Sequence, residues 1–142
     1  MSVTLTFFSP KSTDSKGAIF FDTGISAGFP SPADDFKESR ISLDEELIRN
    51  KEATFFARVS GQSMIGAGLD DNDLLVIDRS IPPTNNKIAV CFLDGEFTVK
   101  RLRVDGNEVW LQPENPDYPI IKITEENNFV IWGIVTNVIK RV

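Results

Sequence analysis

Histidine is absent from the 142-residue sequence. Without it, a serine or cysteine nucleophile cannot use an imidazole base, and metal sites with histidine ligands are excluded as well. Any nucleophilic chemistry in this chain must therefore use a different base.

Long hydrophobic runs are also lacking, and cysteine is scarce. No 18 consecutive apolar residues occur, and the N-terminus has no basic region followed by an apolar run, so we expect neither a membrane span nor a signal peptide. The single cysteine, Cys91, lies in the apolar segment 88–93, where we expect a buried thiol and no intrachain disulfide. These features predict a soluble cytoplasmic protein.

Positive charge is in short supply, because 15 Lys and Arg residues against 21 Asp and Glu residues give a formal net charge of −6. Affinity for a phosphate backbone comes mostly from clustered Lys and Arg side chains. Arg101 and Arg103 are the nearest approach to such a cluster. We therefore expect no direct sequence-specific DNA binding, and any role in DNA metabolism would depend on protein partners.

Composition divides the chain into two regions. Residues 1–40 are polar around 9–17 and then rich in glycine and proline, which disfavours a regular helix or a central strand. We expect a flexible, extended N-terminal arm with Phe7, Phe8, Phe20 and Phe21 as docking anchors. Residues 41–142 supply the apolar material for one compact domain.

The second region begins with a helix signal. Ser42-Leu43-Asp44-Glu45 has the S-x-x-E form of a capping box, in which the serine and glutamate side chains satisfy backbone donors at a helix start. The pattern predicts a short helix to about Asn50, with Leu43, Leu47 and Ile48 on its buried side.

Strand signals follow, and they predict a mainly β, mostly antiparallel fold. Asp94-Gly95 is typical of a two-residue hairpin with positive φ at both positions, and Asp105-Gly106-Asn107 predicts a second turn one strand later. Prolines at 113, 116 and 119 predict a loop between them. The expected strands are 54–60, 74–78, 87–93, 96–104, 108–112, 120–123 and 129–139.

Ser63 is a candidate nucleophile. Ser60-Gly61-Gln62-Ser63-Met64 follows an expected strand and precedes Gly66-Ala67-Gly68, which places Ser63 on a tight turn. A turn can expose the hydroxyl, and its backbone N–H groups can stabilise an oxyanion. By itself, the pattern is more often that of an ordinary turn or cap serine.

Lys100 is the candidate base. Side chains alternate between two faces along the strand 96–104, and Lys100 shares with Thr98, Leu102 and Val104 a face that is at least half buried. Burial disfavours the ammonium form, and a neutral amine near a serine hydroxyl can take its proton. The alternative is a lysine whose stem lies along the sheet while its head reaches water. In a chain without histidine, a turn serine and an inward lysine together indicate a Ser–Lys dyad.

The segments 60–64, 68–78 and 94–102 resemble, in order and spacing, the LexA/UmuD family of autoproteases. Upstream, Ala27-Gly28-Phe29-Pro30-Ser31-Pro32-Ala33 is similar to the cleavage segment of the UmuD branch. The resemblance covers about residues 24–142. Asn72 stands where the family usually has glycine, and asparagine tolerates the positive φ of that turn.

The resemblance implies a partly barrel-like peptidase domain over residues 41–142 and an arm, residues 1–40, that carries the cleavage site. It implies that Ser63 is the nucleophile, that Lys100 is the general base, and that the chain cuts its own Ala27–Gly28 bond. The Ser63 N–H, with that of Met64 as a further candidate, would bind the oxyanion. No cofactor or metal is expected.

The family forms homodimers, is stimulated by the RecA filament as co-protease, and in its UmuD branch assists an error-prone polymerase of the UmuC type in the SOS response. Only residues 1–26 precede the expected cleavage site, too few for the winged helix-turn-helix of LexA-like repressors, which favours the UmuD branch. The alternatives are a non-cleaving regulatory or polymerase-binding dimer and a LexA-like repressor fragment. A signal-peptidase-like enzyme is disfavoured because the chain has no membrane anchor.

Overall fold

The computed structural model describes residues 4–11, 18–21 and 38–142, and the chain forms two compact units. One unit contains residues Met1–Pro10 and Asn50–Val142, and the other contains Lys11–Arg49. The division into an arm and a peptidase domain at residue 40 stays a prediction. No helix among the described residues is long and apolar enough to cross a membrane.

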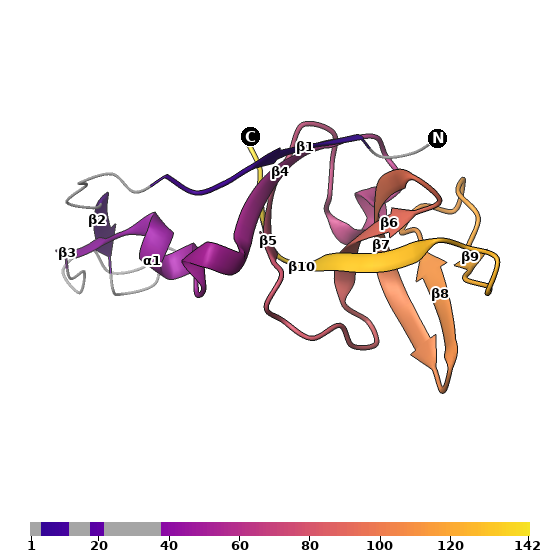
Figure 1. Ribbon diagram of the computed structural model, residues 1–142. Helices are drawn as coiled ribbons and strands as arrows, with labels where there is room; N and C mark the ends of the chain where they lie inside the picture. Colours follow the sequence, from indigo (N-terminus) through magenta and orange to yellow (C-terminus); the bar gives the residue numbers. More distant parts are fainter. Residues whose placement is uncertain (1–3, 12–17, 22–37) are drawn as a thin grey trace. The chain divides into compact units, whose positions relative to one another are not determined.

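The larger unit is built on one eight-stranded sheet in which every neighbouring pair is antiparallel (Figure 1). The expected mainly antiparallel β fold is therefore confirmed. In sheet order the strands are β1 Thr4–Phe8, β4 Thr54–Ser60, β5 Leu74–Asp78, β10 Phe129–Ile139, β6 Ile88–Leu93, β7 Glu96–Asp105, β8 Glu108–Gln112 and β9 Ile121–Lys122.

The sheet curls on itself as a half-barrel, which confirms the partly barrel-like expectation. β1 and β7 are separated by four strands in the sheet order, yet the rings of Phe7 and Phe97 lie 4.9 Å apart. Strand β10 has register shifts between Ile131 and Gly133 and between Val135 and Asn137, and such bulges increase local twist. A Cβ atom on Gly133 would lie 2.6 Å from the Ile77 side chain, so glycine permits the close packing of β10 on β5.

The seven strands predicted between residues 54 and 139 agree with β4 to β10 to within one residue at each end. Asp94 and Gly95 both have positive φ, 49° and 90°, which confirms the predicted type I′ geometry. At the second turn, Gly106 has φ 59°. Asn72 has φ 72°, which agrees with the positive φ expected at this turn.

Two apolar clusters form the core of this unit. One lies around β4, β5 and the segment before β5, and the other contains the buried Cys91, whose thiol is enclosed as predicted. The first cluster comprises Ala57, Val59, Met64, Leu69, Leu75, Ile77, Val90 and Val99, and the second comprises Ala89, Cys91, Leu102, Leu111 and Ile134.

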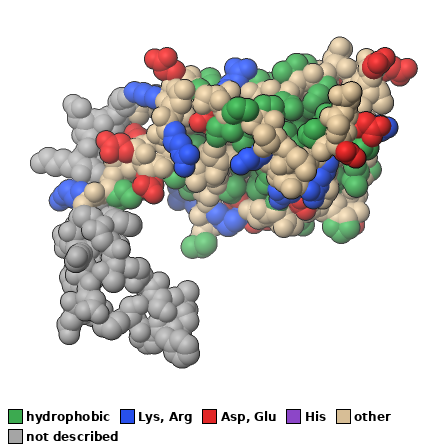
Figure 2. All heavy atoms as spheres, turned by 90° about the horizontal axis from the view of Figure 1, so that it is seen from below, with side chains coloured by type: hydrophobic (Ala, Val, Ile, Leu, Met, Phe, Trp, Pro, Cys, Tyr) green, Lys and Arg blue, Asp and Glu red, His purple; other side chains and the backbone are tan. Residues whose placement is uncertain are grey.

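The surface carries charges of both signs. On the face seen in Figure 2, Lys and Arg side chains are interspersed with Asp and Glu side chains and with hydrophobic patches. That mixture does not form one continuous basic surface on this face, in keeping with the net charge of −6.

The smaller unit contains strands β2 Ala18–Phe21 and β3 Glu38–Ile41, which pair antiparallel, and helix α1 Leu43–Leu47. Ser42 caps the helix by accepting a hydrogen bond from the Glu45 N–H, so the predicted helix start is confirmed. The prediction of a helix to Asn50 was wrong, because Ile48 is already extended. Leu43 was also wrongly expected to be buried. It is 63% exposed, since little more than one helical turn provides no continuous apolar face.

Among the described residues up to 41, β1, β2 and β3 are strands, and none of them is central in a sheet. Phe7 packs on the first core cluster, as an anchor should, whereas Phe8 is 48% exposed. The backbone of Phe20 and Phe21 lies in β2.

Candidate active site

Ser63 lies in the turn between β4 and the 3-10 helix η3 Ile65–Ala67, where the sequence predicts it. The residue is 1% exposed. Gly68 ends η3 with φ 81°, a conformation suited to glycine. Among the described residues, the N–H groups of Ser63 and Met64 donate to no backbone acceptor, so within this part of the chain both are candidate oxyanion donors.

The segment 69–73 braces the turn from one side. Asp71 accepts a hydrogen bond from the Gly61 N–H at 3.0 Å, and the Leu69 N–H donates to the Met64 carbonyl at 3.2 Å. The backbone of Val59 is bonded to this segment in both directions. These contacts hold both ends of the Ser63 turn against the loop that follows it.

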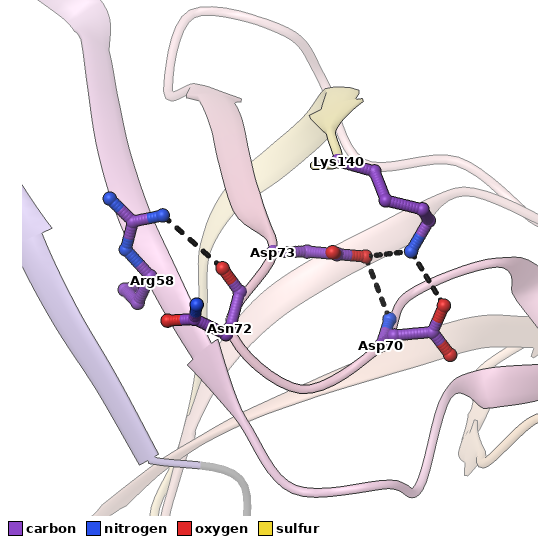
Figure 3. A network of polar contacts seen from close by, with 5 residues as sticks. All are labelled: Arg58, Asp70, Asn72, Asp73 and Lys140. Carbon is purple, nitrogen blue, oxygen red and sulfur yellow. Dashed lines mark hydrogen bonds and ion pairs between the residues drawn. The ribbon is translucent and has the colours of Figure 1, made fainter. Parts of the chain in front are cut away.

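The same segment is tied to the end of β10 (Figure 3). Lys140 donates to Asp70 at 2.6 Å and to Asp73, and Asp73 also accepts from the Asp70 N–H. Both carboxylates raise the pKa of Lys140. On the other side of the segment, Arg58 donates to the Asn72 carbonyl. The loop behind the Ser63 turn is thus fixed by strands β4 and β10.

The proline-rich loop 113–119 braces the turn from the other side. The Asn115 side-chain amide, in a residue only 8% exposed, donates to the Gln62 carbonyl at 2.9 Å. The Gly66 N–H donates to the Glu114 carbonyl at 2.7 Å, and a Cβ atom on Gly66 would lie 2.5 Å from that oxygen. Glu114 also pairs with Arg101, the neighbour of Lys100. The loop therefore joins the serine turn to the lysine strand.

Lys100 lies on β7 and is 5% exposed, so the predicted inward direction of its side chain is confirmed. Its Nζ lies 3.0 Å from Ser63 Oγ, 2.9 Å from Thr98 Oγ1 and 3.1 Å from the Val99 carbonyl oxygen. A neutral amine has two N–H groups and one lone pair. If Thr98 and Val99 accept the two hydrogens, the lone pair faces the Ser63 hydroxyl. This arrangement can draw the hydroxyl proton toward nitrogen.

Burial shifts the pKa of Lys100 in the Ser63–Lys100 pair. It lowers the pKa of Lys100 from 10.5 to about 8, because an ammonium ion loses hydration there, and the nearby Cys91 opposes the shift. Burial also raises the pKa of Cys91 to about 12, so its thiol stays protonated at neutral pH. At pH 7 roughly one Lys100 amine in ten is then neutral, against fewer than about one in a thousand for an ordinary lysine.

A pocket of about 220 Å³ opens beside Lys100. Most of its lining is apolar, with Glu96 as its acidic member, and it therefore suits an apolar side chain next to a bond held at Ser63. Its lining residues are Leu93, Glu96, Thr98, Lys100, Tyr118, Pro119 and Ile121.

The structure brings Ser63, Met64 and Lys100 together, whereas Ala27 and Gly28 lie outside the described residues. Sequence reasoning missed Asn115 and the acceptor role of Thr98. The prolines around Asn115 predicted only a loop, and nothing local in the sequence marks its contact with Gln62, 53 positions away. No group of three or more Cys, Asp or Glu side chains within the described ranges is arranged to hold a metal ion.

Comparison with known proteins places these residues in a family context. Residues 19–136 match the family model described as Peptidase S24-like. The chain is 43% identical over 119 residues to Protein MucA of Salmonella typhimurium, covering 83% of this chain and 81% of that protein. It is 42% identical over 132 residues to Protein ImpA of Salmonella typhimurium, covering 93% and 90%. Similarity extends to the LexA repressor of Acidithiobacillus ferrooxidans, 36% identical over 119 residues, or 82% of this chain and 58% of the repressor.

Proposed function

The chain belongs to the Peptidase S24-like family, a family of serine peptidases, and we propose that it cuts its own Ala27–Gly28 bond with Ser63 as nucleophile and Lys100 as base. The observation that carries the proposal is the 3.0 Å contact between Lys100 Nζ and Ser63 Oγ at a buried position. No carboxylate pairs with Lys100 among the described residues, so its charge is not held in place by an ion pair.

In the proposed reaction, Lys100 takes the Ser63 proton while Oγ attacks the Ala27 carbonyl carbon. The N–H groups of Ser63 and Met64 bind the oxyanion of the tetrahedral intermediate. The bond to Gly28 then breaks, and the Lys100 ammonium returns a proton to the leaving Gly28 amine. Water, deprotonated by Lys100, then attacks the Ala27 carbonyl carbon of the ester. The bond to Ser63 Oγ breaks, and the Lys100 ammonium returns the proton to Oγ. The small methyl side chain of Ala27 and the lack of a side chain at Gly28 minimise steric hindrance at the scissile carbonyl.

The resemblance to the UmuD branch supports a biological setting for this chemistry. We propose that a RecA filament stimulates the cleavage and that the shortened chain, as a homodimer, assists an error-prone DNA polymerase of the UmuC type. The proteins named MucA, ImpA and SamA, 42–43% identical to this chain, are relatives in which the same arrangement can be sought.

Mass spectrometry of the purified full chain tests the proposal. The chain is incubated at pH 7 and near pH 10, with and without a RecA filament on single-stranded DNA. We expect a new fragment that begins at Gly28, formed faster at the higher pH because more Lys100 is neutral. The fragment should be absent in Ser63→Ala and in Lys100→Ala.

An intact wild-type chain under all four conditions would contradict self-cleavage. A fragment with a different N-terminus would contradict only the choice of bond. Cleavage that persists in Ser63→Ala would show that another group, or a contaminating protease, is the nucleophile.

A further inference from the structure

Strand β1 closes one edge of the large sheet (Figure 1). It pairs with β4 from Thr4 opposite Ser60 to Phe8 opposite Phe56, and the other neighbour of β4 is β5. If β1 were removed, β4 would become an edge strand with unpaired N–H and C=O groups. Such an edge is a template for another extended chain.

Two alternate side chains anchor β1. Leu5 and Phe7 are partly buried against the cluster that contains Ala57 and Val59, and the Phe7 ring lies 4.8 Å from the ring of Trp132. Their neighbours Thr6 and Phe8 are exposed. The seat of β1 is thus a strand edge with one aliphatic and one aromatic position on its inner side.

The connection between β1 and β4 runs through residues 9–53, and the proposed scissile bond lies inside it. A cut between Ala27 and Gly28 would leave β1 without any covalent link to the sheet on which it packs. We propose that β1 is a releasable strand, whose loss after cleavage opens the β4 edge to an extended segment of another protein. This inference rests on the proposed function, since it assigns a consequence to the same cut.

The physical basis is the change from an intramolecular to a bimolecular contact. A tethered segment meets its seat at an effective concentration in the millimolar range, whereas a free peptide does so at its own concentration. At micromolar protein, the ratio of bound to free β1 therefore falls by about a thousandfold after the cut. The freed fragment would be held by β1, five residues with two anchors, and by the four-residue pairing of β2 with β3 across the cut. Both contacts are small for a free ligand, because association also costs translational and rotational freedom.

The seat defines the chemistry of the incoming segment. It should be extended and carry an aliphatic and then an aromatic side chain two positions apart, as Leu5 and Phe7 do. Arg58 is exposed opposite Thr6, so a polar or acidic residue fits between the two anchors.

The test uses the full Ser63→Ala chain with a recognition site for an added protease inserted between Ala27 and Gly28. Uncut and cut samples are passed through gel filtration, and binding of a fluorescent peptide of residues 2–11 is then measured by anisotropy. We expect the cut chain to lose its N-terminal fragment and to bind the peptide at least about 100-fold more tightly than the uncut chain. A peptide with Phe7→Asp should not bind.

Hydrogen exchange provides a second measurement. Amides of β4 that pair with β1 should exchange faster in the cut chain and become protected again when peptide is added. Four outcomes would each overturn the inference. The N-terminal fragment could stay bound at nanomolar dilution, or both samples could bind the peptide equally. The Phe7→Asp peptide could bind as well as the original, or the cut chain could self-associate without binding peptide. Because an added protease makes the cut, failure of wild-type self-cleavage is a separate result that overturns only the proposed function.

Discussion

At the scale of single residues, Lys100 combines a buried position with three polar contacts and no ion pair among the described residues. Its folded-state pKa of about 8 lies below the ordinary value of 10.5. Below pH 8 both the folded and the unfolded chain carry the proton, so the folded chain bears the full cost of a buried ammonium. Between pH 8 and 10.5 the unfolded chain binds more protons, and stability therefore rises with pH in that window.

Lys100→Met should consequently stabilise the protein near neutral pH. A shift from 10.5 to about 8 corresponds to at most about 3 kcal/mol, and the gain is reduced by the contacts that the amine loses. The difference in free energy of unfolding between the variant and the wild type should shrink as pH rises to 10.5. Urea unfolding at pH 7 and pH 10 measures it, with Ser63→Ala as the background for both chains so that cleavage does not interfere. A variant that is less stable at pH 7 would contradict the burial cost.

Thr98 is predicted to direct the lone pair of Lys100 toward Ser63. Thr98→Val keeps the shape but removes the acceptor of one N–H group, so the plateau of self-cleavage should fall about tenfold, as expected for one lost hydrogen bond. The midpoint of the pH–rate profile should move below that of the wild type, because the ammonium form loses an acceptor. Thr98→Ser restores the hydroxyl and should restore both values. An unchanged profile in Thr98→Val would exclude this role.

Ser63 and Lys100 could be predicted because each carries a local signal, a turn after a strand and a two-residue alternation along a strand. The contact between them joins residues 37 positions apart and could be expected only from chemistry and family resemblance. Asn115 could not be predicted in the same way. Its hydrogen bond to Gln62 depends on how a loop folds back over 53 positions, and nothing local in the sequence specifies that path.

At the scale of elements, the loop 113–119 and the serine turn act as one assembly. In a planar trans peptide the carbonyl and the following N–H point in opposite directions. By holding the Gln62 carbonyl, Asn115 therefore also sets the direction of the Ser63 N–H, the proposed oxyanion donor. A loop without direct contact to substrate would in this way control the geometry of the oxyanion site.

Asn115→Asp should lower the plateau rate of self-cleavage by about 10- to 100-fold, because the carboxylate cannot donate to Gln62. The expected loss is smaller than the roughly 100- to 1,000-fold effect of removing an oxyanion donor, since the Ser63 N–H is misplaced and not removed. The midpoint of the pH–rate profile should stay unchanged, since Lys100 is untouched. Asp117→Asn, a reverse exchange at an exposed position of the same loop, is the matched control and should cleave normally. Equal rates in both variants would contradict the role of Asn115.

The peptide group itself can be observed. Gln62-Ser63 is the only Gln–Ser pair in the sequence, so labelling with carbonyl-¹³C glutamine and ¹⁵N serine gives a single correlation in an HNCO spectrum. That signal should move in Asn115→Asp and stay in place in Asp117→Asn. A general loss of loop stability would leave the folded-state signal where it is in wild type.

At the scale of the whole molecule, local patterns predicted the strands from β4 to β10 but not the closing of the sheet. Alternation and hairpin turns are properties of neighbouring residues, and the seven strands accordingly matched. The pairing of β1 with β4 joins residues more than 40 positions apart, and the proline- and glycine-rich composition of residues 1–40 gives no sign of it. The pairing of an edge strand depends on the free strand edge and the apolar contacts that the rest of the sheet provides, and these form only in the folded domain.

Phe7 is the side chain through which β1 contacts the far side of the curled sheet. Its ring packs against Phe97 of β7 and Trp132 of β10, so Phe7→Ala should destabilise the larger unit by about 2 kcal/mol, the value for a partly buried phenylalanine. Phe8→Ala removes the same atoms from a 48% exposed neighbour on the same strand and should change stability by less than about 0.5 kcal/mol. Denaturant unfolding followed by tryptophan fluorescence, in the Ser63→Ala background, compares the two. Similar losses in both variants would mean that β1 is held by its backbone pairing alone, and the curl of the sheet would then need no anchor from the N-terminal strand.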